Sequence, residues 1–161
     1  MIESLKKSIS QNFAGVSFNL ENWGEVIDKS SDVSVLYLKS TVDYYSLYFE
    51  GVNLSFALYE NKMPIGIYPL IIHKNENNWF LSGDGKSLIK PLFIKSIAKI
   101  AKKRIEKQIL EIIYYIAREL EIKKVHIVEF SPALSEWYLL WLDRASKSFL
   151  THQLAIDLRL T

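Results

Sequence analysis

The chain has 161 residues, enough for one domain with a sizeable core, and 49% of them are hydrophobic while 24% are charged. This balance excludes a disordered chain, and a net charge of only +2 excludes a general attraction to nucleic acid. The absence of cysteine excludes disulfides and thiolate sites, and it makes a reducing cytoplasm the expected compartment. Since no secretion signal or apolar run of about 20 residues occurs, we expect no membrane span.

The first fifty residues carry the weakest pattern. Asn22 is followed three residues later by an acid, which is the spacing of a helix cap, whereas the β-branched run 33–38 indicates a strand. Ser40 and Asp43 have capping-box spacing before an aromatic run, and Gly51 follows that run. We therefore predict a short helix, a strand and a second short helix in this part.

The middle of the chain is predicted to form three antiparallel strands. Apolar and polar residues alternate from 52 to 59, and after a polar turn apolar residues continue from 65 to 71. A second polar turn at 73–78 leads into a short strand at 79–81. Pro69 falls inside the second strand and has no N–H, so we expect it at a sheet edge, a bulge or a splay between strands.

The period then changes to that of a helix. Apolar residues recur every three or four positions from 94 to 120, and the lysines lie on other faces. The run 125–130 indicates another strand, which a helical crossover makes parallel to the strand before the helix. The Ser-Pro pair at 131–132 opens a further helix, and 151–158 alternates as a last strand. Together these elements predict an α+β fold with one mixed sheet, an antiparallel meander, a long crossover helix and a C-terminal β-α-β unit.

The polar loop 82–87 and the basic stretch after it form the most distinctive segment. There is no acid between Gly85 and Ile105, but seven basic residues occur there: Lys86, Lys90, Lys95, Lys99, Lys102, Lys103 and Arg104. Because helix starts already carry partial positive charge, cations placed there favour a bound anion, phosphate above all. The candidate donor- or anion-binding residues are therefore Ser82, Gly83, Gly85, Lys86, Lys90 and Lys95.

Simpler interpretations of this segment stay open. Residues 83–85, two glycines around an aspartate, also make an ordinary turn, and the basic face 95–103 is also typical of a solvated surface. A Walker-type nucleotide loop is excluded, since its first glycine would fall on Phe80. RNA binding through 95–104 is a further alternative, and it predicts an affinity that falls steeply with salt.

Titratable residues on the predicted strands are candidates for catalysis. Glu129 is the candidate general base, because a carboxylate in an apolar wall has a raised pKa suited to deprotonating an amine. Solvent exposure of Glu129 at its strand end is the alternative. His126 and His152 are expected to be buried, hydrogen-bonded histidines rather than bases. Three histidines without ligand spacing, and no cysteine, predict no metal site.

The run 56–92, FALYENKMPIGIYPLIIHKNENNWFLSGDGKSLIKPL, with the long helix after it and the ending THQLAIDL, resembles the GNAT-like domain of the FemAB family. The likeness covers roughly residues 40–158 as an order of elements with short motifs. It implies a single GNAT-like domain, 1–161, that acts as an acyl- or aminoacyl-transferase on an amine of a cell-envelope or polysaccharide precursor. The donor it implies is phosphorylated, either a CoA thioester or an aminoacyl-tRNA, and nucleic acid is a partner only in the second case.

The resemblance also implies where the donor lies, near the end of the strand before the long helix, around 81–92. Splayed strands open the donor groove in such folds, so Pro69, Leu81 and His126 are expected to form its wall. Backbone N–H groups at 81–83 would stabilise the oxyanion while Glu129 removes the amine proton.

The chain departs from the family pattern in two ways. None of its six glycines completes the pyrophosphate loop of acetyl-CoA enzymes, which argues against CoA. Fem-type proteins usually have two GNAT-like lobes, so 1–161 corresponds to the N-terminal lobe of a longer two-lobe protein. The alternative function is therefore a non-catalytic lobe for folding, dimerisation or docking, with a second lobe or a second copy as partner. The aromatic residues are expected in the core, and an exposed surplus would indicate a partner surface.

Overall fold

A computed structural model describes residues 1–76, 78–129 and 135–142. Within this part the chain forms an α+β fold, as predicted, with two antiparallel sheets. The helices are α1 (Ile2–Asn12), α2 (Trp23–Asp28), α3 (Lys39–Tyr48), α4 (Lys99–Glu119) and α5 (Glu136–Leu142), with a 3-10 helix η1 (Val35–Tyr37). The strands are β1 (Val16–Ser17), β2 (Val52–Asn53), β3 (Phe56–Glu60), β4 (Met63–Tyr68), β5 (Ile71–Asn75), β6 (Asn78–Ser82) and β7 (Leu92–Phe93). No helix of these ranges is both long and apolar enough to cross a membrane.

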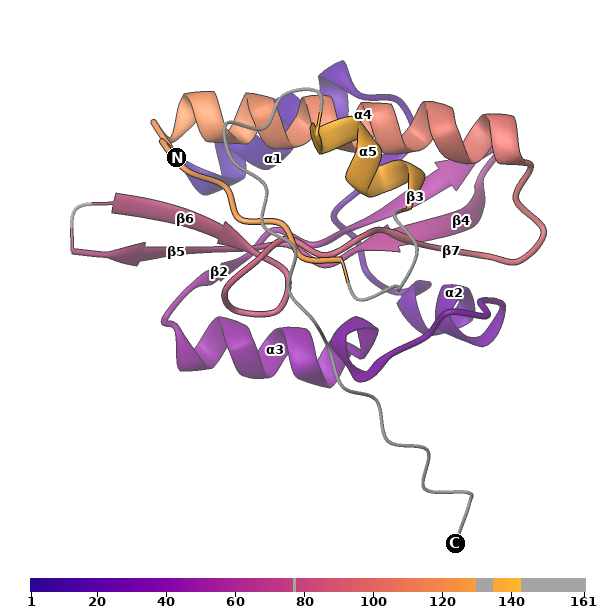
Figure 1. Ribbon diagram of the computed structural model, residues 1–161, viewed down its shortest axis with the longest axis horizontal. Helices are drawn as coiled ribbons and strands as arrows, with labels where there is room; N and C mark the ends of the chain where they lie inside the picture. The colour runs from indigo at the N-terminus through magenta and orange to yellow at the C-terminus, as the bar shows by residue number, and fades with distance from the viewer. Residues whose placement is uncertain (77, 130–134, 143–161) are drawn as a thin grey trace, which may run out of the picture.

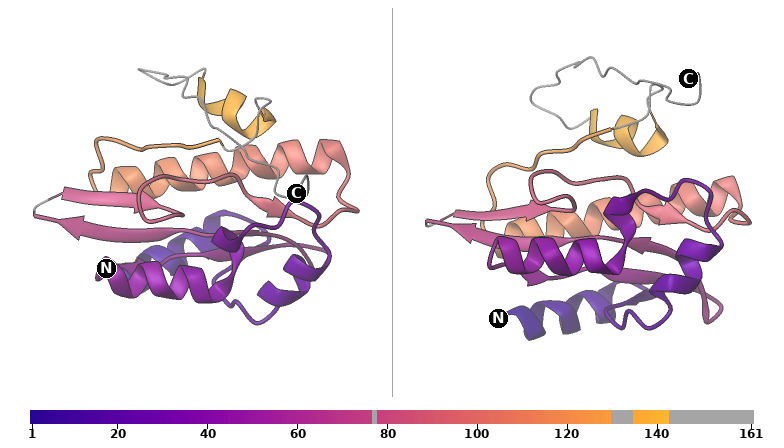
Figure 2. Two further views of the ribbon diagram at one scale, coloured as in Figure 1. Left: turned by 60° about the horizontal axis from the view of Figure 1, so that its bottom comes forward. Right: turned by 90° about the horizontal axis from the view of Figure 1, so that it is seen from below.

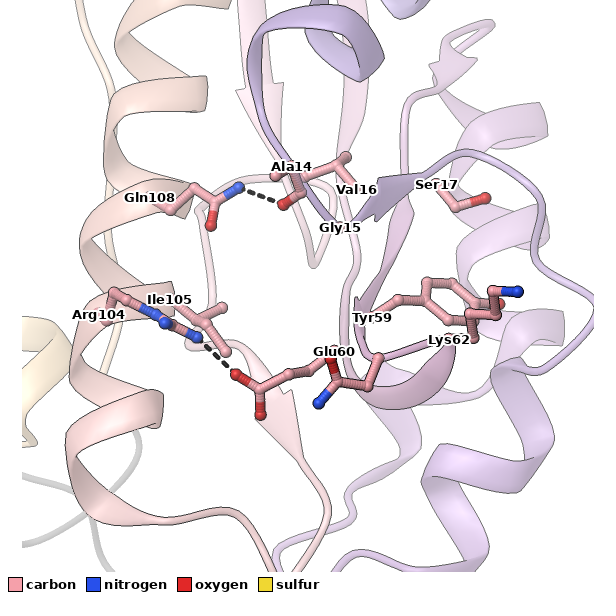
Figure 3. Close-up of a pocket in the computed structure, with 11 residues that line it drawn as sticks. Ala14, Gly15, Val16, Ser17, Tyr59, Glu60, Lys62, Arg104, Ile105 and Gln108 are labelled. Atoms are coloured by element: carbon pink, nitrogen blue, oxygen red, sulfur yellow. Dashed lines mark hydrogen bonds and ion pairs between the residues drawn. The ribbon is translucent and has the colours of Figure 1, made fainter.

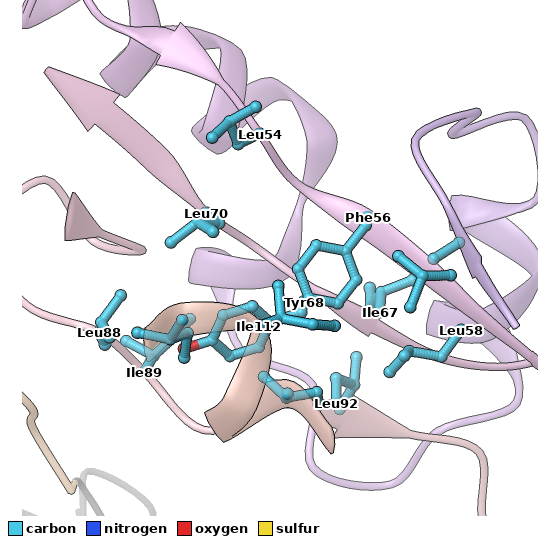
Figure 4. Packing of buried hydrophobic residues seen from close by; sticks show 14 of the residues in the cluster. Leu54, Phe56, Leu58, Ile67, Tyr68, Leu70, Leu88, Ile89, Leu92 and Ile112 are labelled. Atoms are coloured by element: carbon cyan, nitrogen blue, oxygen red, sulfur yellow. The ribbon is translucent and has the colours of Figure 1, made fainter. Parts of the chain in front are cut away.

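The sheets form a central layer with helices on both sides. One sheet has the strand order β1-β3-β4-β7 and the other β2-β5-β6. Figure 1 shows α1 and α4 on one side of the sheets, α2 and α3 on the other, and α5 beside α4. The core between these layers is built mainly from aliphatic side chains of the sheets and α4, with Phe56 and Tyr68 among them (Figure 4).

The single mixed sheet predicted from the sequence is two sheets in the structure, because both long strands break at the same level. The predicted strand 65–71 is divided at Pro69, where β4 ends and β5 begins. The opposite strand divides at Leu54 and Ser55, and there the Leu70 N–H donates to Ser55 Oγ (2.9 Å) instead of to a ladder carbonyl. Pro69 therefore lies at the break between β4 and β5, where the two neighbouring strands stay joined by the Leu54 N–H, which donates to Leu70 O (2.8 Å).

Of the parallel strand predicted at 125–130, the described residues 125–129 form one parallel bridge, between Leu88 and Ile127. The Leu88 N–H donates to His126 O (2.7 Å), and the Val128 N–H donates to Leu88 O (3.0 Å). The predicted direction is thus correct, but the partner is the segment after the polar loop and not β6. The predicted helix opening at 131–132, the strand 151–158 and His152 lie outside the described residues.

The N-terminal third differs most from the sequence prediction. The run 33–38 contains η1 and not a strand, since no neighbouring strand pairs with it and only Tyr37 of the run is buried. β-branched residues favour a strand only where a neighbouring strand can pair with them. Helix α1 was not predicted, although Leu5 and Ile9 are buried at helical spacing. The helices expected around Asn22 and Ser40 are present as α2 and α3.

Helix α4 begins later than its apolar pattern. The pattern starts at Ile94, but Ile94 belongs to the sheet side of the connection, where its N–H donates to Ile65 O (3.1 Å). The helix proper starts at Lys99. The early apolar residues of the pattern therefore belong to the connection between β7 and the helix. The buried residues of the helix itself begin at Ile105.

Candidate functional site

The polar loop 82–87 hydrogen-bonds to itself. Asp84 Oδ1 accepts the N–H groups of Lys86 (2.9 Å) and Ser87 (2.5 Å). Ser87 O in turn accepts the N–H groups of Gly83 (2.7 Å) and Asp84 (3.3 Å). The Asp84 carboxylate thus occupies the position in which a bound anion would meet these amides, as in the ordinary-turn interpretation.

The glycines of this loop pack closely against neighbouring elements. Gly85 has φ +86°, and a Cβ there would lie 2.4 Å from Cε2 of Phe49, just after α3. A Cβ on Gly83 would lie 3.1 Å from Pro69 O. Leu81 and Ser82 before the loop are also buried. Side chains therefore fill the junction where the donor groove was expected.

The lysines predicted for the anion site do not converge on the loop, since Lys86 and Lys95 are exposed and Lys90 is half-buried. His126 is exposed, so the prediction that it is a buried histidine was wrong. Lys90 O accepts a hydrogen bond from Tyr37 Oη (3.0 Å), and the charge of Glu129 acts on the same phenol. The structure thus brings two of the predicted site residues, Lys90 and Glu129, to one place beside Tyr37.

Four buried polar side chains and the half-buried Glu129 lie around Tyr37 or at α5. Tyr37 neighbours Glu129 and Tyr68, and the charge of Glu136, the first residue of α5, acts on Glu106. We call the set the buried polar cluster: Tyr37, Tyr68, Glu106, Glu129 and Trp137. Tyr68 and Trp137 are almost completely buried, and their ring centroids are 5.8 Å apart. Among the described residues, Tyr68 Oη, Trp137 Nε1 and Glu106 Oε2 have no hydrogen-bond partner. Buried polar atoms of this kind are rare in native proteins and call for an explanation.

Burial keeps the two phenols of the cluster neutral. It raises the pKa of Tyr37 well above its ordinary value, and the negative charges of Glu129 and Asp32 raise it further. Burial also raises the pKa of Tyr68, and the neighbouring Tyr37 raises it further. Both hydroxyls therefore remain protonated, and each can donate a hydrogen bond.

Glu106 is a buried acid on an apolar helix face. It is 3% exposed, and the other six buried residues of α4 are isoleucine or leucine. Burial raises the pKa of Glu106, the charge of Glu136 adds to the rise, and the charges of three lysines oppose it: Lys102, Lys103 and Lys90. A carboxyl group with a raised pKa is the type of group that enzymes use for proton transfer near neutral pH.

The sequence analysis missed four members of the cluster as site residues: Tyr37, Tyr68, Glu106 and Trp137. Glu106 had a visible signal, because it is an acid between apolar positions of the α4 stripe. Tyr68 is likewise a polar-tipped residue within an apolar strand, next to Pro69. Tyr37 gave no such signal, since its position depends on η1 and on the Trp23 Nε1–H donating to its carbonyl (2.7 Å). Glu129 was found from its strand position, and it accepts a hydrogen bond from Ser135 Oγ.

A separate surface cleft of about 850 Å³ lies between α4 and the strands β1 and β3 (Figure 3). Two contacts bridge it, from Gln108 Nε2 to Ala14 O (2.8 Å) and from Arg104 Nη2 to Glu60 Oε1 (2.6 Å). A second cleft of about 600 Å³ lies at Asn78 and the end of α4. Neither contains a site residue predicted from the sequence. No group of His, Asp and Glu in the described residues has the arrangement of a metal site.

Comparison of the chain with known protein families, with curated proteins and with solved structures finds no match.

Proposed function

We propose that the chain is an acyl- or aminoacyl-transferase domain of the FemAB type, with the buried polar cluster as its proton-transfer centre. The observation that carries the proposal is a buried acid of raised pKa, Glu106, together with a buried, neutral phenol, Tyr68, that has no hydrogen-bond partner among the described residues. Both adjoin α5, since Tyr68 packs against Trp137 and the charge of Glu136 acts on Glu106. The sequence resemblance supplies the reaction class, and the cluster supplies groups that such a reaction needs.

In this proposal an amine attacks the acyl carbonyl of the donor. A C–N bond forms, the bond from the acyl carbon to the leaving sulfur or oxygen breaks, and the amine proton is transferred to the leaving group. Glu106 is the first candidate to accept that proton, and Glu129, whose charge acts on Tyr37, is the second. Tyr68 Oη donates to the developing oxyanion, a role first assigned to the N–H groups at 81–83.

Substrate access sets a condition on this mechanism. Tyr68 is fully buried and packs against Trp137 of α5. Donor and acceptor therefore reach the cluster only when α5 moves aside, while Lys90, whose charge acts on Glu106, meets the charged part of the donor. The acceptor we propose is a cell-envelope or polysaccharide precursor, and the cysteine-free composition fits a cytoplasmic site of action.

The test is a transfer assay on the purified chain with acyl-CoA thioesters or aminoacyl-tRNA as donors and amino sugars or peptide amines as acceptors. We expect turnover with one donor class. We expect Glu106→Gln to lower kcat by about 100-fold or more, because a general base contributes about 10²–10⁴ in rate. If Glu129→Gln lowers kcat more than Glu106→Gln does, Glu129 is the base instead.

Glu119→Gln is the matched control, since Glu119 lies at the exposed end of the same helix. It should leave turnover unchanged. The proposal fails if neither donor class supports transfer or raises the melting temperature, or if turnover persists in both Glu106→Gln and Glu129→Gln.

A docking lobe without chemistry is the second candidate. One observation favours it, the exposed apolar side chains of α3, among them Leu47 at 80% exposure. Docking and catalysis are compatible, so an inactive chain that still associates would leave docking as the only function.

A further inference from the structure

Helix α3 carries an unusual amount of exposed apolar surface. Six of the eleven large hydrophobic side chains that are exposed in the described residues lie between 33 and 48. On α3 itself, Tyr44 is 57% exposed, Leu47 80% and Tyr48 67%. These three residues have i, i+3 and i+4 spacing, so they form one stripe, which we call the α3 face. A contiguous apolar patch of this kind on a folded domain marks an interaction surface.

The opposite side of α3 is already occupied. Val42 is buried against the molecule, and Tyr45 and Phe49 point their rings towards the loop at Gly85. In both views of Figure 2 the helix lies at the outside of the molecule, and no described element covers its outer side. Tyr44 stacks on Tyr48 with centroids 5.8 Å apart, so the exposed rings support each other. Two stacked rings lose little conformational freedom when a partner covers them.

The charges around the α3 face restrict what can cover it. Helices that bind anionic membranes or nucleic acid carry lysine and arginine beside their apolar face. α3 has a single basic residue, Lys39, against Asp43 on the helix and Glu50 just after it. The surroundings are therefore slightly acidic, and a protein surface is the matching partner class.

We propose that the α3 face is a symmetric interface through which two copies of this chain pair. The ends of the helix have opposite charge, Lys39 at the start and Glu50 at the end. A two-fold axis across the stripe makes the helices antiparallel, so that Lys39 of each copy approaches Glu50 of the other. Lys39 lies 3.6 Å from Asp43, a loose exposed pair that leaves its amino group able to take a second partner. The centre of the stripe holds no charge and two tyrosines, the composition favoured in interface cores.

The experiment is sedimentation equilibrium of the chain over a range of concentrations. We expect the mass to rise from the 18.7 kDa of one chain towards twice that value. Leu47→Glu and Tyr48→Glu should each raise the dissociation constant by about tenfold or more, since a charge would be buried at the centre of the interface. Ile100→Glu is the matched control, because Ile100 is 86% exposed on α4, away from the α3 face, and its replacement should leave the dimer intact.

Charge reversal tests the antiparallel geometry. Lys39→Glu and Glu50→Lys should each weaken the dimer, and the double variant should restore it, because the contact is then reversed in sign. Circular dichroism checks that each variant is folded. A wild-type chain that stays monomeric at every concentration overturns the proposal, as does a dimer that Leu47→Glu leaves unchanged. Binding of wild type, but not Leu47→Glu, to phosphatidylserine vesicles would assign the face to a membrane instead. None of these outcomes depends on transfer activity.

Discussion

Glu106 lies on the buried face of α4 among isoleucine and leucine, where an ionised carboxylate loses most of its hydration. The charges of Lys102, Lys103 and Lys90 supply only part of the compensation, so burial remains the dominant influence on its pKa. The group is thus costly for stability in its charged form, which is typical of residues retained for function rather than for folding.

The raised pKa of Glu106 predicts how stability depends on pH. At about pH 4 the side chain is mostly protonated in both the folded and the unfolded chain, so it contributes no difference. As pH rises, the unfolded chain ionises first, and the unfolding free energy falls until the raised pKa of the folded chain is passed. Glu106→Gln removes this loss, so the variant should match wild type at about pH 4 and exceed it at about pH 8.

Urea denaturation at several pH values measures this difference. Glu119→Gln, at the exposed end of α4, should show the same pH dependence as wild type. A Glu106→Gln variant that is less stable than wild type at about pH 8 would contradict the prediction and indicate that the carboxylate has a partner.

Gly85 is a position where any side chain is expected to be costly. Its φ of +86° is unfavourable for other residues, and an added Cβ would overlap the ring of Phe49. Gly85→Ala should therefore lower the unfolding free energy by about 1–3 kcal/mol. Gly24, in α2, has open space around it, so Gly24→Ala should be neutral or stabilise by up to about 1 kcal/mol. Equal effects of the two substitutions in urea denaturation would refute this account.

At the scale of elements, the loop 82–87 is held by its own aspartate. Asp84→Ala removes the acceptor of two backbone N–H groups, and we expect a loss of about 1–2 kcal/mol in unfolding free energy. Lys86→Ala, at an exposed neighbour, should change stability by less than about 0.5 kcal/mol. The unfolding free energies of the two variants are measured by guanidinium denaturation and compared with that of wild type. A stable Asp84→Ala chain would mean that the loop amides are satisfied without the carboxylate.

Elements with strong periodicity were predictable, and those that depend on distant partners were not. The alternation at 52–59 and the helical stripe after 94 led to strands and to α4, because burial of one face imposes the period on the sequence. The run 33–38 has the composition of a strand but no strand beside it, so its local preference was overridden. A break such as the one at Pro69 can be expected from the missing N–H, whereas its form depends on Ser55 in the opposite strand.

The candidate site was predictable only in part, for the same reason. Lys90 and Glu129 were selected from their segments, and both adjoin Tyr37 in the structure. Tyr37 and Tyr68 come from η1 and β4, and Glu106 of α4 adjoins Glu136 of α5, so these neighbours are a property of the tertiary packing that no local pattern encodes. The polar loop illustrates the converse, since its glycines and aspartate suit both an anion site and a closed turn.

At the scale of the whole molecule, helices on both sides bury the two sheets, while no element in the described part of the chain covers the apolar outer side of α3. The domain therefore has a complete core in the described residues together with one surface suited to a partner. Helix α5 lies beside α4, whereas α3 lies on the opposite side of the sheets (Figure 1). Pairing through α3 would leave the route to the cluster unobstructed in both copies.

The passage of the chain between its sheets has a mechanical consequence. Both long strands change sheet at the same level, and the two crossings are tied together where the Leu54 N–H donates to Leu70 O (2.8 Å) and Ser55 Oγ contacts both polar groups of Leu70. Neither sheet can therefore separate from the other without breaking these hydrogen bonds. Heat or denaturant that loosens one half of the layer also loosens the other, and the two sheets melt as a single cooperative unit.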